Sequence, residues 1–292
     1  MKAMITGAGG QLATELARTA PTHCDISLLT LDDLDITRKD DVLEAVEQID
    51  PDVIVNGSAY TAVDQAETDA DLAHLVNAIG PWNLSLAASR NKCRLVQPST
   101  DFVFDGESTV PWAIDSRTNP LSVYGRTKRD GELAVIEECS APWTIVRTAW
   151  VYSSTGKNFV RSMLGFMKDG KNLRIIDDQQ GTPTWARSLA SAIWCLIDRE
   201  IGGVQHWTDG GSTSWYGFAC AIAEIGVEAG MLTAMPEIDP IPTSEYPTPA
   251  TRPAYSVLDK SETWAVLKDA NCMPPVDWKE NLRNMMLELN NG

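Results

Sequence analysis

The sequence predicts an α/β fold built on a doubly wound parallel sheet. Three observations lead to this prediction. Short apolar stretches alternate with amphipathic ones through the first half, the first apolar stretch ends in the glycine-rich turn TGAGGQ, and a later one, LVQPST, ends in serine and threonine. Alternating strands and helices are typical of parallel sheets with helices on both faces. The chain has 292 residues, 43% of them hydrophobic, which suits one large domain or a domain and a half.

Strands are expected where short apolar runs lie between turn signals, and helices where apolar residues recur at helical spacing. The expected strands are KAMIT (2–6), ISLLTL (26–31), DVIVNGSAY (52–60), CRLVQPST (93–100) and WTIVRTAWVY (143–152). The expected helices are GQLATELART (10–19), KDDVLEAVEQI (39–49), LAHLVNAIGPWNLSLAASR (72–90, interrupted near Gly80-Pro81) and SVYGRTKRDGELAVIEEC (122–139). Together they predict a first domain over residues 1–150.

After about residue 150 the pattern changes. Helical stretches such as NFVRSMLGFMKDG and WYGFACAIAEIGVEAG are separated by loops rich in proline, threonine and serine. The stretch 239–256, DPIPTSEYPTPATRPAYS, holds five prolines, which exclude it from regular helix or sheet. Loops of this length in a compact protein are often functional. Residues 151–292 are therefore expected to form a smaller portion, from which some segments return to the first sheet.

Charge and composition exclude several classes of protein. The formal net charge of −16 opposes binding to phosphate backbones, so no nucleic-acid partner is expected. No apolar run approaches a membrane span, and the first residues enter a strand rather than a signal peptide. The six cysteines form no CxxC pair, and we expect reduced core residues in a cytoplasmic protein. They are Cys24, Cys93, Cys139, Cys195, Cys220 and Cys272.

The turn MITGAGGQLATEL places glycines between a strand and a helix. Such a turn brings backbone N–H groups close to a pyrophosphate at the positive end of the helix dipole. The spacing does not fit GxGxxG, because Leu12 stands at the last glycine position, but it fits GxxGxxA with Gly7, Gly10 and Ala13. A plain structural turn is the alternative. The position of the turn in the first strand–helix unit favours a dinucleotide cofactor.

The end of the second strand, LLTLDDLDI, bears on which cofactor binds. An acidic residue there holds the ribose 2′-OH of NADH, whereas an arginine accommodates the 2′-phosphate of NADPH. Asp32 and Asp33 stand at this point, and the first basic residue is Arg38. This favours NADH, although both aspartates could instead be solvated loop residues. The cofactor is therefore expected to be NADH or NADPH.

The stretch NPLSVYGRTK places Tyr124 and Lys128 one helical turn apart. Asn119 is the expected N-cap and Pro120 the expected first helical residue. A lysine cation beside a phenol lowers its pKa towards the range where it protonates a ketone oxygen at neutral pH. By itself a YxxxK pair is common on exposed helices, where it has no catalytic role.

The preceding strand gives this pair its context. LVQPST ends in Ser99 and Thr100 at the carboxyl edge, where doubly wound sheets bind ligands. A hydroxyl there can orient the carbonyl oxygen that the tyrosine protonates. The glycine turn, the strand-end hydroxyls and YxxxK occur in the order that a ketone reductase needs.

These motifs resemble those of the extended short-chain dehydrogenases/reductases, and within them the dTDP-4-dehydrorhamnose reductases. The resemblance covers nearly the whole chain, through ITGAGGQLATEL, PDVIVNGSAYTAVDQAE, STDFVFDG, PLSVYGRTK, RTAWVY and PTSEYPTPATRP. It implies a Rossmann-type domain over 1–150 and a mainly substrate-binding portion over 151–292. It also implies reduction of the C4 ketone of dTDP-4-dehydro-L-rhamnose by NAD(P)H, in a monomer or homodimer.

The resemblance assigns roles residue by residue. It implies that the catalytic residues are Thr100, Tyr124 and Lys128, with Tyr124 and Lys128 also touching the cofactor. It implies that the cofactor-binding residues are Gly7, Gly10, Gln11, Leu12, Gly57, Ser58 and Ala59, to which the strand-end argument adds Asp32. It implies that the substrate-side residues are Asp101, Phe102 and Trp150. Arg252 is a further candidate for the sugar diphosphate, with a solvated loop arginine as the alternative.

Three positions depart from the family pattern. Ala13 replaces the usual last glycine of the turn, and Leu31 stands where many relatives carry an arginine, which puts the NADPH preference in doubt. Some relatives dimerise around a metal held by glutamates. Glu15 matches one such ligand, but Arg187 stands where another would be. No metal site is therefore expected.

Two other functions remain open. A nucleotide-sugar 4-epimerase uses the same three catalytic residues, and a non-catalytic regulatory subunit resembling that of methionine adenosyltransferase uses the same fold. A 4,6-dehydratase is disfavoured, because its Asp-Glu pair after the threonine is here Asp101-Phe102. Of the ten tryptophans, most are expected in the core, with Trp207 and Trp215 as weaker candidates for the sugar pocket.

Overall fold

The computed structural model describes residues 1–268, 272 and 274–291. A six-stranded sheet in the order β10-β5-β4-β3-β1-β2 forms its centre, and all its neighbouring strands pair in parallel. Its strands are β1 (Lys2–Thr6), β2 (Asp25–Leu29), β3 (Val53–Asn56), β4 (Arg94–Thr100), β5 (Trp143–Thr148) and β10 (Gly203–His206). The predicted α/β class with a doubly wound parallel sheet is confirmed.

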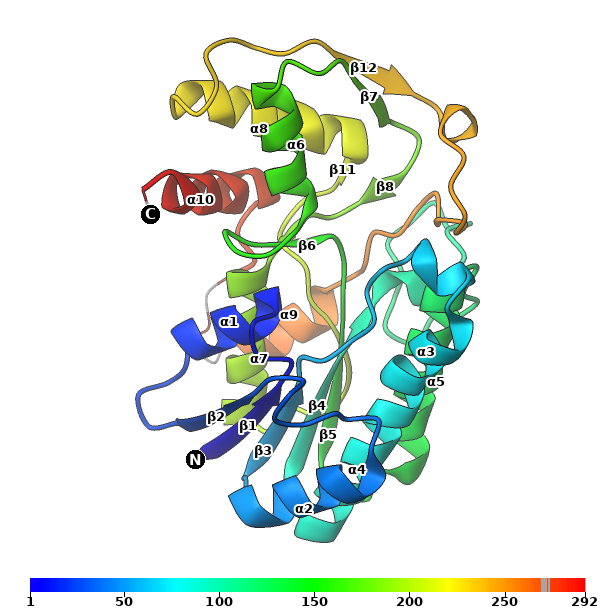
Figure 1. The fold of residues 1–292 in the computed structure, drawn as a ribbon, viewed down its shortest axis with the longest axis vertical. Coiled ribbons are helices and arrows are strands. Elements are labelled where there is room, and N and C mark those ends of the chain that lie inside the picture. Colours follow the sequence, from blue (N-terminus) through cyan, green and yellow to red (C-terminus); the bar gives the residue numbers. More distant parts are fainter. Residues whose placement is uncertain (269–271, 273, 292) are drawn as a thin grey trace.

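Helices cover both faces of the sheet (Figure 1). On one face lie α1 (Gln11–Arg18), α7 (Ala186–Asp198) and α9 (Ser261–Lys268). On the other lie α2 (Lys39–Ile49), α4 (Gly80–Asn91) and α5 (Val123–Glu138). Ala3 and Ile5 of β1 pack on the first face and Met4 on the second. Strands buried on both faces are apolar at nearly every position, which explains why the sequence shows them clearly.

A second layer lies beyond the carboxyl edge of the sheet, at the top of Figure 1. Its apolar core contains residues from three helices, α6 (Phe159–Lys168), α8 (Trp215–Glu228) and α10 (Trp278–Asn291). Its short strands are β6 (Val151–Tyr152), β7 (Leu173–Ile176), β8 (Gln180–Gly181), β9 (Thr184–Trp185), β11 (Thr213–Ser214) and β12 (Ile238–Ile241). Since β12 pairs with β7, the first residues of the stretch 239–256 do lie in a sheet, contrary to the expectation from its prolines. Since β10 lies in the central sheet, the chain after residue 150 contributes to both layers. A division at residue 150 remains a prediction.

The helix expected over 72–90 is continuous through its Gly-Pro step. Here α3 (Ala70–His74) leads through a π-helical turn, η2 (Leu75–Ile79), directly into α4. Proline has no N–H to donate to the preceding turn, and Pro81 directly follows the π-helical turn, at the second residue of α4. The interruption is thus a local widening of the helix.

The expected start of the next helix was wrong. Asn119 and Pro120 lie in the loop, and α5 begins at Val123 with Ser122 as its N-cap. The Ser122 hydroxyl accepts from the Gly125 N–H at 3.1 Å. The Asn119 amide group instead donates to Asp105 at 3.0 Å, within the loop before the helix. The described residues also include the 3₁₀ turns η1 (Gln65–Glu67), η3 (Asp101–Val103) and η4 (Thr243–Glu245).

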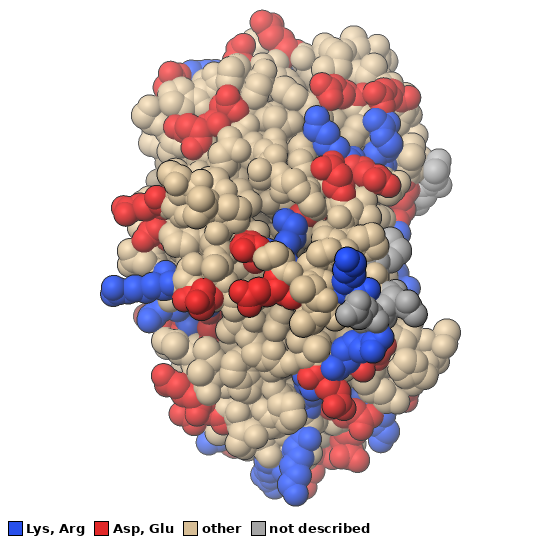
Figure 2. Space-filling model, turned by 180° about the vertical axis from the view of Figure 1, so that it is seen from behind, with Lys and Arg blue, Asp and Glu red and all other residues tan. Residues whose placement is uncertain are grey.

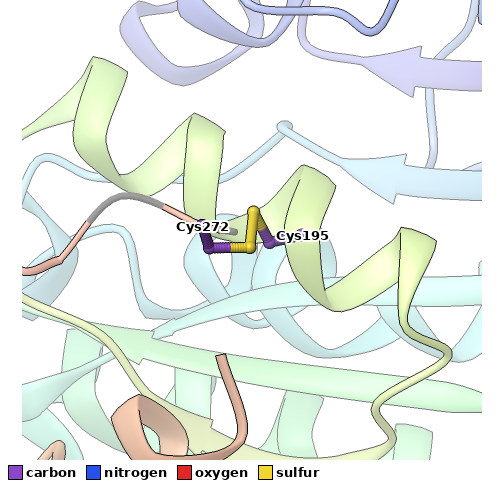
Figure 3. Close-up of a disulfide and its surroundings, with 2 residues drawn as sticks. All are labelled: Cys195 and Cys272. Atoms are coloured by element: carbon purple, nitrogen blue, oxygen red, sulfur yellow. A yellow bond between two sulfur atoms is a disulfide. The ribbon is translucent and has the colours of Figure 1, made fainter. Parts of the chain in front are cut away.

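The expectation that all cysteines are reduced is also corrected. Cys195 in α7 and Cys272, between α9 and α10, form a disulfide (Figure 3). The two positions are 77 residues apart in the sequence, and their Cα atoms lie 6.2 Å apart in the structure. The linear spacing of the cysteines does not reveal such a meeting. Cys24, Cys93, Cys139 and Cys220 are free thiols.

Candidate active site

The β1–α1 turn packs its backbone directly against the end of β3. Gly7 has a φ of +70°, and a Cβ there would lie 2.6 Å from the Gly57 carbonyl. A Cβ on Gly57 would lie 2.5 Å from the Thr6 carbonyl oxygen. Only glycines allow so close an approach. The α1 N-cap, Gly10, provides no side-chain cap, so the first N–H groups of α1 remain available to an anion.

Several predicted cofactor residues meet at this turn. Gln11 and Leu12 open α1, next to Gly10, while Ser58 and Ala59 follow Gly57 after β3. The Gln11 carboxamide accepts from Asn158 at 3.0 Å, which connects the turn to the residue before α6. Asn158 has no signal in the sequence, because 147 residues separate it from Gln11.

The two aspartates after β2 have different surroundings. Asp33 accepts from the Thr30 N–H and hydroxyl at 2.9 and 2.7 Å, and these bonds lower the pKa of its carboxyl. Asp32 is exposed beside Leu31, whose side chain is 73% exposed. Asp33 therefore shapes the loop, whereas Asp32 is the carboxylate open to a ligand.

Thr100 lies where β4 ends, at the carboxyl edge of the sheet. Its hydroxyl donates to Asp101 Oδ1 at 3.0 Å and accepts from the Phe102 N–H at 3.2 Å. The Phe102 ring meets the Tyr124 ring edge-on, with centroids 5.6 Å apart. Asp101 is buried, and burial raises the pKa of its carboxyl to about 6, against the hydrogen bonds from Ser256 and Thr100.

Tyr124 and Lys128 lie on the face of α5 that packs against β4. Burial raises the pKa of Tyr124 to about 12, while a hydrogen bond with Thr100 opposes the rise. The Lys128 ammonium donates to the Pro98 carbonyl at 2.8 Å. Lys128 is 5% exposed, and burial lowers its pKa to about 8, against the negative charge of Glu132. The expected lowering of the Tyr124 pKa by Lys128 is therefore not seen in this structure. A phenol that holds its proton next to the Thr100 hydroxyl can still donate that proton to a carbonyl oxygen.

A cavity of about 690 Å³ lies in the second layer. Its wall contains the aromatic residues Trp215 and Phe159 and the basic residues Lys171, Arg174 and Arg252. This combination of aromatic rings and cations suits a ligand with a flat ring and a negative charge. Lys171 and Arg174 were not predicted, because the sequence gives no signal that they line this cavity. Arg174 also pairs with Glu245 of the loop at 239–256.

Two predicted substrate residues make contacts that the sequence does not show. Trp150 has a φ of +47° and stacks on Trp215, with ring centroids 3.6 Å apart. Arg252 is not a solvated loop arginine, since it binds Asp64 through two hydrogen bonds of 3.0 and 2.8 Å. It therefore holds the proline-rich loop against the loop after β3. Trp207, the other tryptophan considered, is buried against α7.

Arg187 lies beside Glu15, the residue that matches a metal ligand of some relatives. Its Nε donates to Glu15 Oε2 at 2.7 Å, and Arg18 donates to Oε1 at 3.0 Å. The buried carboxylate of Glu15 thus accepts hydrogen bonds from two guanidinium groups. Among the described residues, no group of three or more acidic, histidine or cysteine side chains is arranged to hold a metal. The expected absence of a metal stays a prediction.

Charge and helix length bear on possible partners. On the face shown in Figure 2, the basic residues of the described chain are interspersed with acidic ones. No helix within the described ranges is long and apolar enough to cross a membrane. The oligomeric state and the absence of a nucleic-acid partner remain predictions.

Comparison with known proteins identifies the family. Residues 1–291 match the family model described as the RmlD substrate binding domain. The dTDP-4-dehydrorhamnose reductase of Burkholderia thailandensis is 41% identical over 96% of both chains. A probable dTDP-4,6-dihydroxy-2-methyloxan-3-one 4-ketoreductase of Streptomyces antibioticus is 40% identical over 97% of this chain and 94% of its own.

Solved structures agree with these sequence matches. A dTDP-4-dehydrorhamnose reductase from Clostridium acetobutylicum superimposes with a TM-score of 0.92 at 38% identity, covering 99% of both chains. One from Bacillus anthracis, in complex with NADP, has a TM-score of 0.90 at 34% identity, covering 98% of this chain and 99% of that one. The chain therefore belongs to the RmlD family, the dTDP-4-dehydrorhamnose reductases of the extended short-chain dehydrogenases/reductases.

Proposed function

We propose that this protein reduces the C4 ketone of dTDP-4-dehydro-L-rhamnose to give dTDP-L-rhamnose, with NADH or NADPH as cofactor. The observation that carries the proposal is the meeting of Thr100, Tyr124 and Lys128 at the carboxyl end of β4. The names and coverage of the relatives support the substrate, since chains that match from end to end share the fold and the cleft.

The residues present fit a dinucleotide. The close approach of Gly7 to Gly57 leaves no side chain between the turn and the end of β3, and the uncapped start of α1 offers N–H groups to a pyrophosphate. Gly10, Gln11 and Leu12 would hold the phosphates, and Ser58 and Ala59 the adenosine side. Asp32 would meet the adenine ribose. When bound, the cofactor supplies the hydride for the C4 carbon.

The three catalytic residues divide the remaining chemistry. Tyr124 donates its phenolic proton to the C4 oxygen, and because burial makes this phenol a weaker acid, the phenolate that forms needs stabilisation by its neighbours. Lys128 stabilises the phenolate that results and holds the nicotinamide ribose. Thr100 orients the ketone oxygen through its hydroxyl. Once the phenolate forms, Lys128 and Thr100 together lower its cost.

The substrate would bind between the two layers. Asp101 and Phe102 follow Thr100 and would contact the sugar, with Trp150 held in place by its stacking on Trp215. Arg252 and its neighbours in the 690 Å³ cavity would meet the diphosphate and base. Arg252 retains N–H groups beyond its bonds to Asp64, because a guanidinium has five donors.

The test is oxidation of NADH and NADPH in the presence of the dTDP-4-keto sugar, prepared in situ from dTDP-glucose by the preceding dehydratase and epimerase. Tyr124→Phe is expected to lower kcat by about 10²–10⁴-fold while cofactor still binds, since it removes the general acid alone. Near-normal turnover by this variant would contradict the assignment. Cofactor binding without any ketosugar-dependent oxidation in the wild type would favour an epimerase or a regulatory subunit.

We also infer a cytoplasmic monomer or homodimer. Reduced nicotinamide cofactors and nucleotide sugars are metabolites of the cytoplasm, which supports this location for a reductase. Cell fractionation followed by light scattering of the purified protein tests both points. Recovery with the membrane or the culture medium would contradict the location, and a stable higher oligomer would contradict the assembly.

A further inference from the structure

Glu132 is a buried carboxylate on the same helical face as the two catalytic residues of α5. It follows Lys128 by four positions and Tyr124 by eight, so the three side chains form one row along the helix. Glu132 is 3% exposed. A carboxylate this deeply buried is costly unless its oxygens are fully bonded, so its contacts indicate what it is there to hold.

Both oxygens of Glu132 are bonded, and by residues of two neighbouring strands. Arg147 in β5 donates from Nε to Oε1 at 2.9 Å and from Nη2 to Oε2 at 2.8 Å, a bidentate pair. Ser99 in β4 donates its hydroxyl to Oε1 at 2.5 Å. Ser99 directly precedes Thr100. Glu132 therefore connects the catalytic helix to the strand end that carries the catalytic threonine.

We propose that Glu132 is a positioning residue for the reaction: its charge keeps Lys128 in the cationic form, and its bond to Ser99 fixes the strand end at Thr100. The proposal rests on the proposed function of Lys128 and Thr100 in ketone reduction. Glu132 itself touches neither cofactor nor substrate and acts through these two residues.

The effect of Glu132 on the charge of Lys128 is important because few other groups stabilise the buried ammonium. Among the described residues, the Lys128 ammonium donates a hydrogen bond to the neutral Pro98 carbonyl. A buried ammonium tends to lose its proton, because burial penalises the charged form. Glu132 is the charged group that opposes this penalty and holds the pKa at about 8. Without it, Lys128 would be neutral over much of the physiological range and could no longer stabilise the Tyr124 phenolate.

The positive charge of Arg147, which is paired with Glu132, weakens the effect of Glu132 on the charge of Lys128 without removing it. Its guanidinium lies on β5, where Nη1 also donates to the Ile114 carbonyl at 3.1 Å. His206 in β10 lies 3.4 Å from the same nitrogen. Burial and Arg147 lower the pKa of His206 to about 3, so His206 is neutral and adds no charge. The carboxylate of Glu132 thus faces one permanent cation.

The other titratable groups packed near α5 have partners of their own. Glu67 of η1 accepts from the Val123 N–H at 2.8 Å. His74 of α3 lies 4.0 Å from Asp130, on another face of α5. From η2 the neutral Asn77 bonds Thr127.

The remaining groups are Arg90 of α4 and the ionisable residues of the catalytic cleft. Arg90 pairs with Glu47 of α2, away from Lys128. Within the cleft, the ionisable neighbours are Tyr124 and Asp101 of η3, and the charge of Asp101 raises the pKa of Tyr124. Among the groups that the structure describes, Glu132 is therefore the one that sets the charge of Lys128.

The direct test is an NMR titration of Lys128 in protein labelled at the lysine side chain, with the signal assigned through Lys128→Met. Glu132→Gln keeps the shape and several hydrogen bonds of the side chain but removes its charge. We expect the titration midpoint of Lys128 to fall by about one pH unit. Glu137→Gln removes the same charge from an exposed position of α5 and is expected to leave the midpoint unchanged. An unchanged midpoint in Glu132→Gln would overturn the proposal.

Arg147→Gln supplies a test of opposite sign. It leaves Glu132 as an uncompensated anion, so the Lys128 midpoint should rise. A loosened fold would hydrate Lys128 and also raise its midpoint, so the test requires that Arg147→Gln unfolds in denaturant as cooperatively as the wild type. If Glu132→Gln does not fold, the double variant Glu132→Gln/Arg147→Gln, which replaces the ion pair by two amides, should still lower the midpoint. A midpoint that falls in Arg147→Gln, or stays in the double variant, would contradict the electrostatic role.

The kinetic consequence is a change in the pH profile. As pH rises, Lys128 loses its proton and kcat falls; in Glu132→Gln this fall should begin about one unit lower. The kcat of the variant relative to the wild type should therefore recover as pH decreases towards 6. An equal reduction at every pH would indicate a purely structural role. Since the NMR titration needs no substrate, it still tests the proposal if the wild type proves not to reduce the keto sugar.

Discussion

The proposed cofactor side and the proposed substrate side of the molecule are built from different parts of the chain. The cofactor side is a backbone surface in which Gly7, Gly57 and the start of α1 meet with no side chain between them. The substrate side is a surface of side chains from α6, β7, α8 and the proline-rich loop. A backbone surface tolerates almost no change, whereas a side-chain surface can lose one member and keep its shape. Substitutions on the two sides should therefore have different consequences.

The largest effect is expected from Gly7→Ala on the cofactor side. The new Cβ would lie 2.6 Å from the Gly57 carbonyl, in a backbone conformation with positive φ. Both penalties apply, so we expect the free energy of unfolding to fall by about 3 kcal/mol and cofactor binding to be lost. Denaturant unfolding and cofactor fluorescence titration measure the two.

Gly9→Ala is the matched control for this substitution. Gly9 has a φ of +88° in the same turn, but a Cβ there would meet nothing within 4 Å. It should cost only the strain of the conformation, about 1–2 kcal/mol, and retain cofactor binding. Equal losses in the two variants would mean that strain, and not the close approach to Gly57, governs the turn.

The difference between a backbone surface and a side-chain surface also explains how much of each side can be predicted from the sequence. The glycine turn, the strand-end Thr100 and the Tyr124–Lys128 row depend on local spacing, and the structure brings them to one edge of the sheet. The start of α5 was misplaced because Asn119 and Ser122 are both residue types that favour N-caps, and Ser122 is the one that caps the helix. A local pattern does not show that Asn119 instead donates to Asp105.

Contacts between distant segments were not predictable at all. Arg252 meets Asp64 across 188 residues, and Arg187 meets Glu15 across 172. Cys272 meets its disulfide partner across 77 residues. Nothing in the sequence around any of these residues indicates its partner. The order in which helices and loops pack determines which of them meet.

A smaller effect is expected from Arg252→Gln on the substrate side. The variant loses the bidentate pair with Asp64 and a cation of the cavity, but the aromatic walls remain. We expect the KM for the sugar nucleotide to rise roughly tenfold with little change in kcat, since the contact serves binding and not the reacting carbon. As a control, Arg283→Gln on α10 removes an exposed ion pair with Glu228 of α8 and should leave both constants unchanged. A fall in kcat with unchanged KM would place Arg252 in the chemical step instead.

The smallest effect is expected from Asp32→Ala, and it bears on the one part of the cofactor side that is a side-chain surface. Asp32 is exposed, while Asp33 is engaged with Thr30, so the loop should keep its shape. Loss of one exposed hydrogen bond to the ribose is worth about 1 kcal/mol, so the KM for NADH should rise about fivefold. The KM for NADPH should fall, because a carboxylate that repels the 2′-phosphate is gone. Asp40→Ala removes the same charge from the start of α2 and controls for long-range electrostatics. If both cofactors respond equally in Asp32→Ala, then Asp32 does not contact the ribose, and the backbone alone determines how this side of the molecule binds its cofactor.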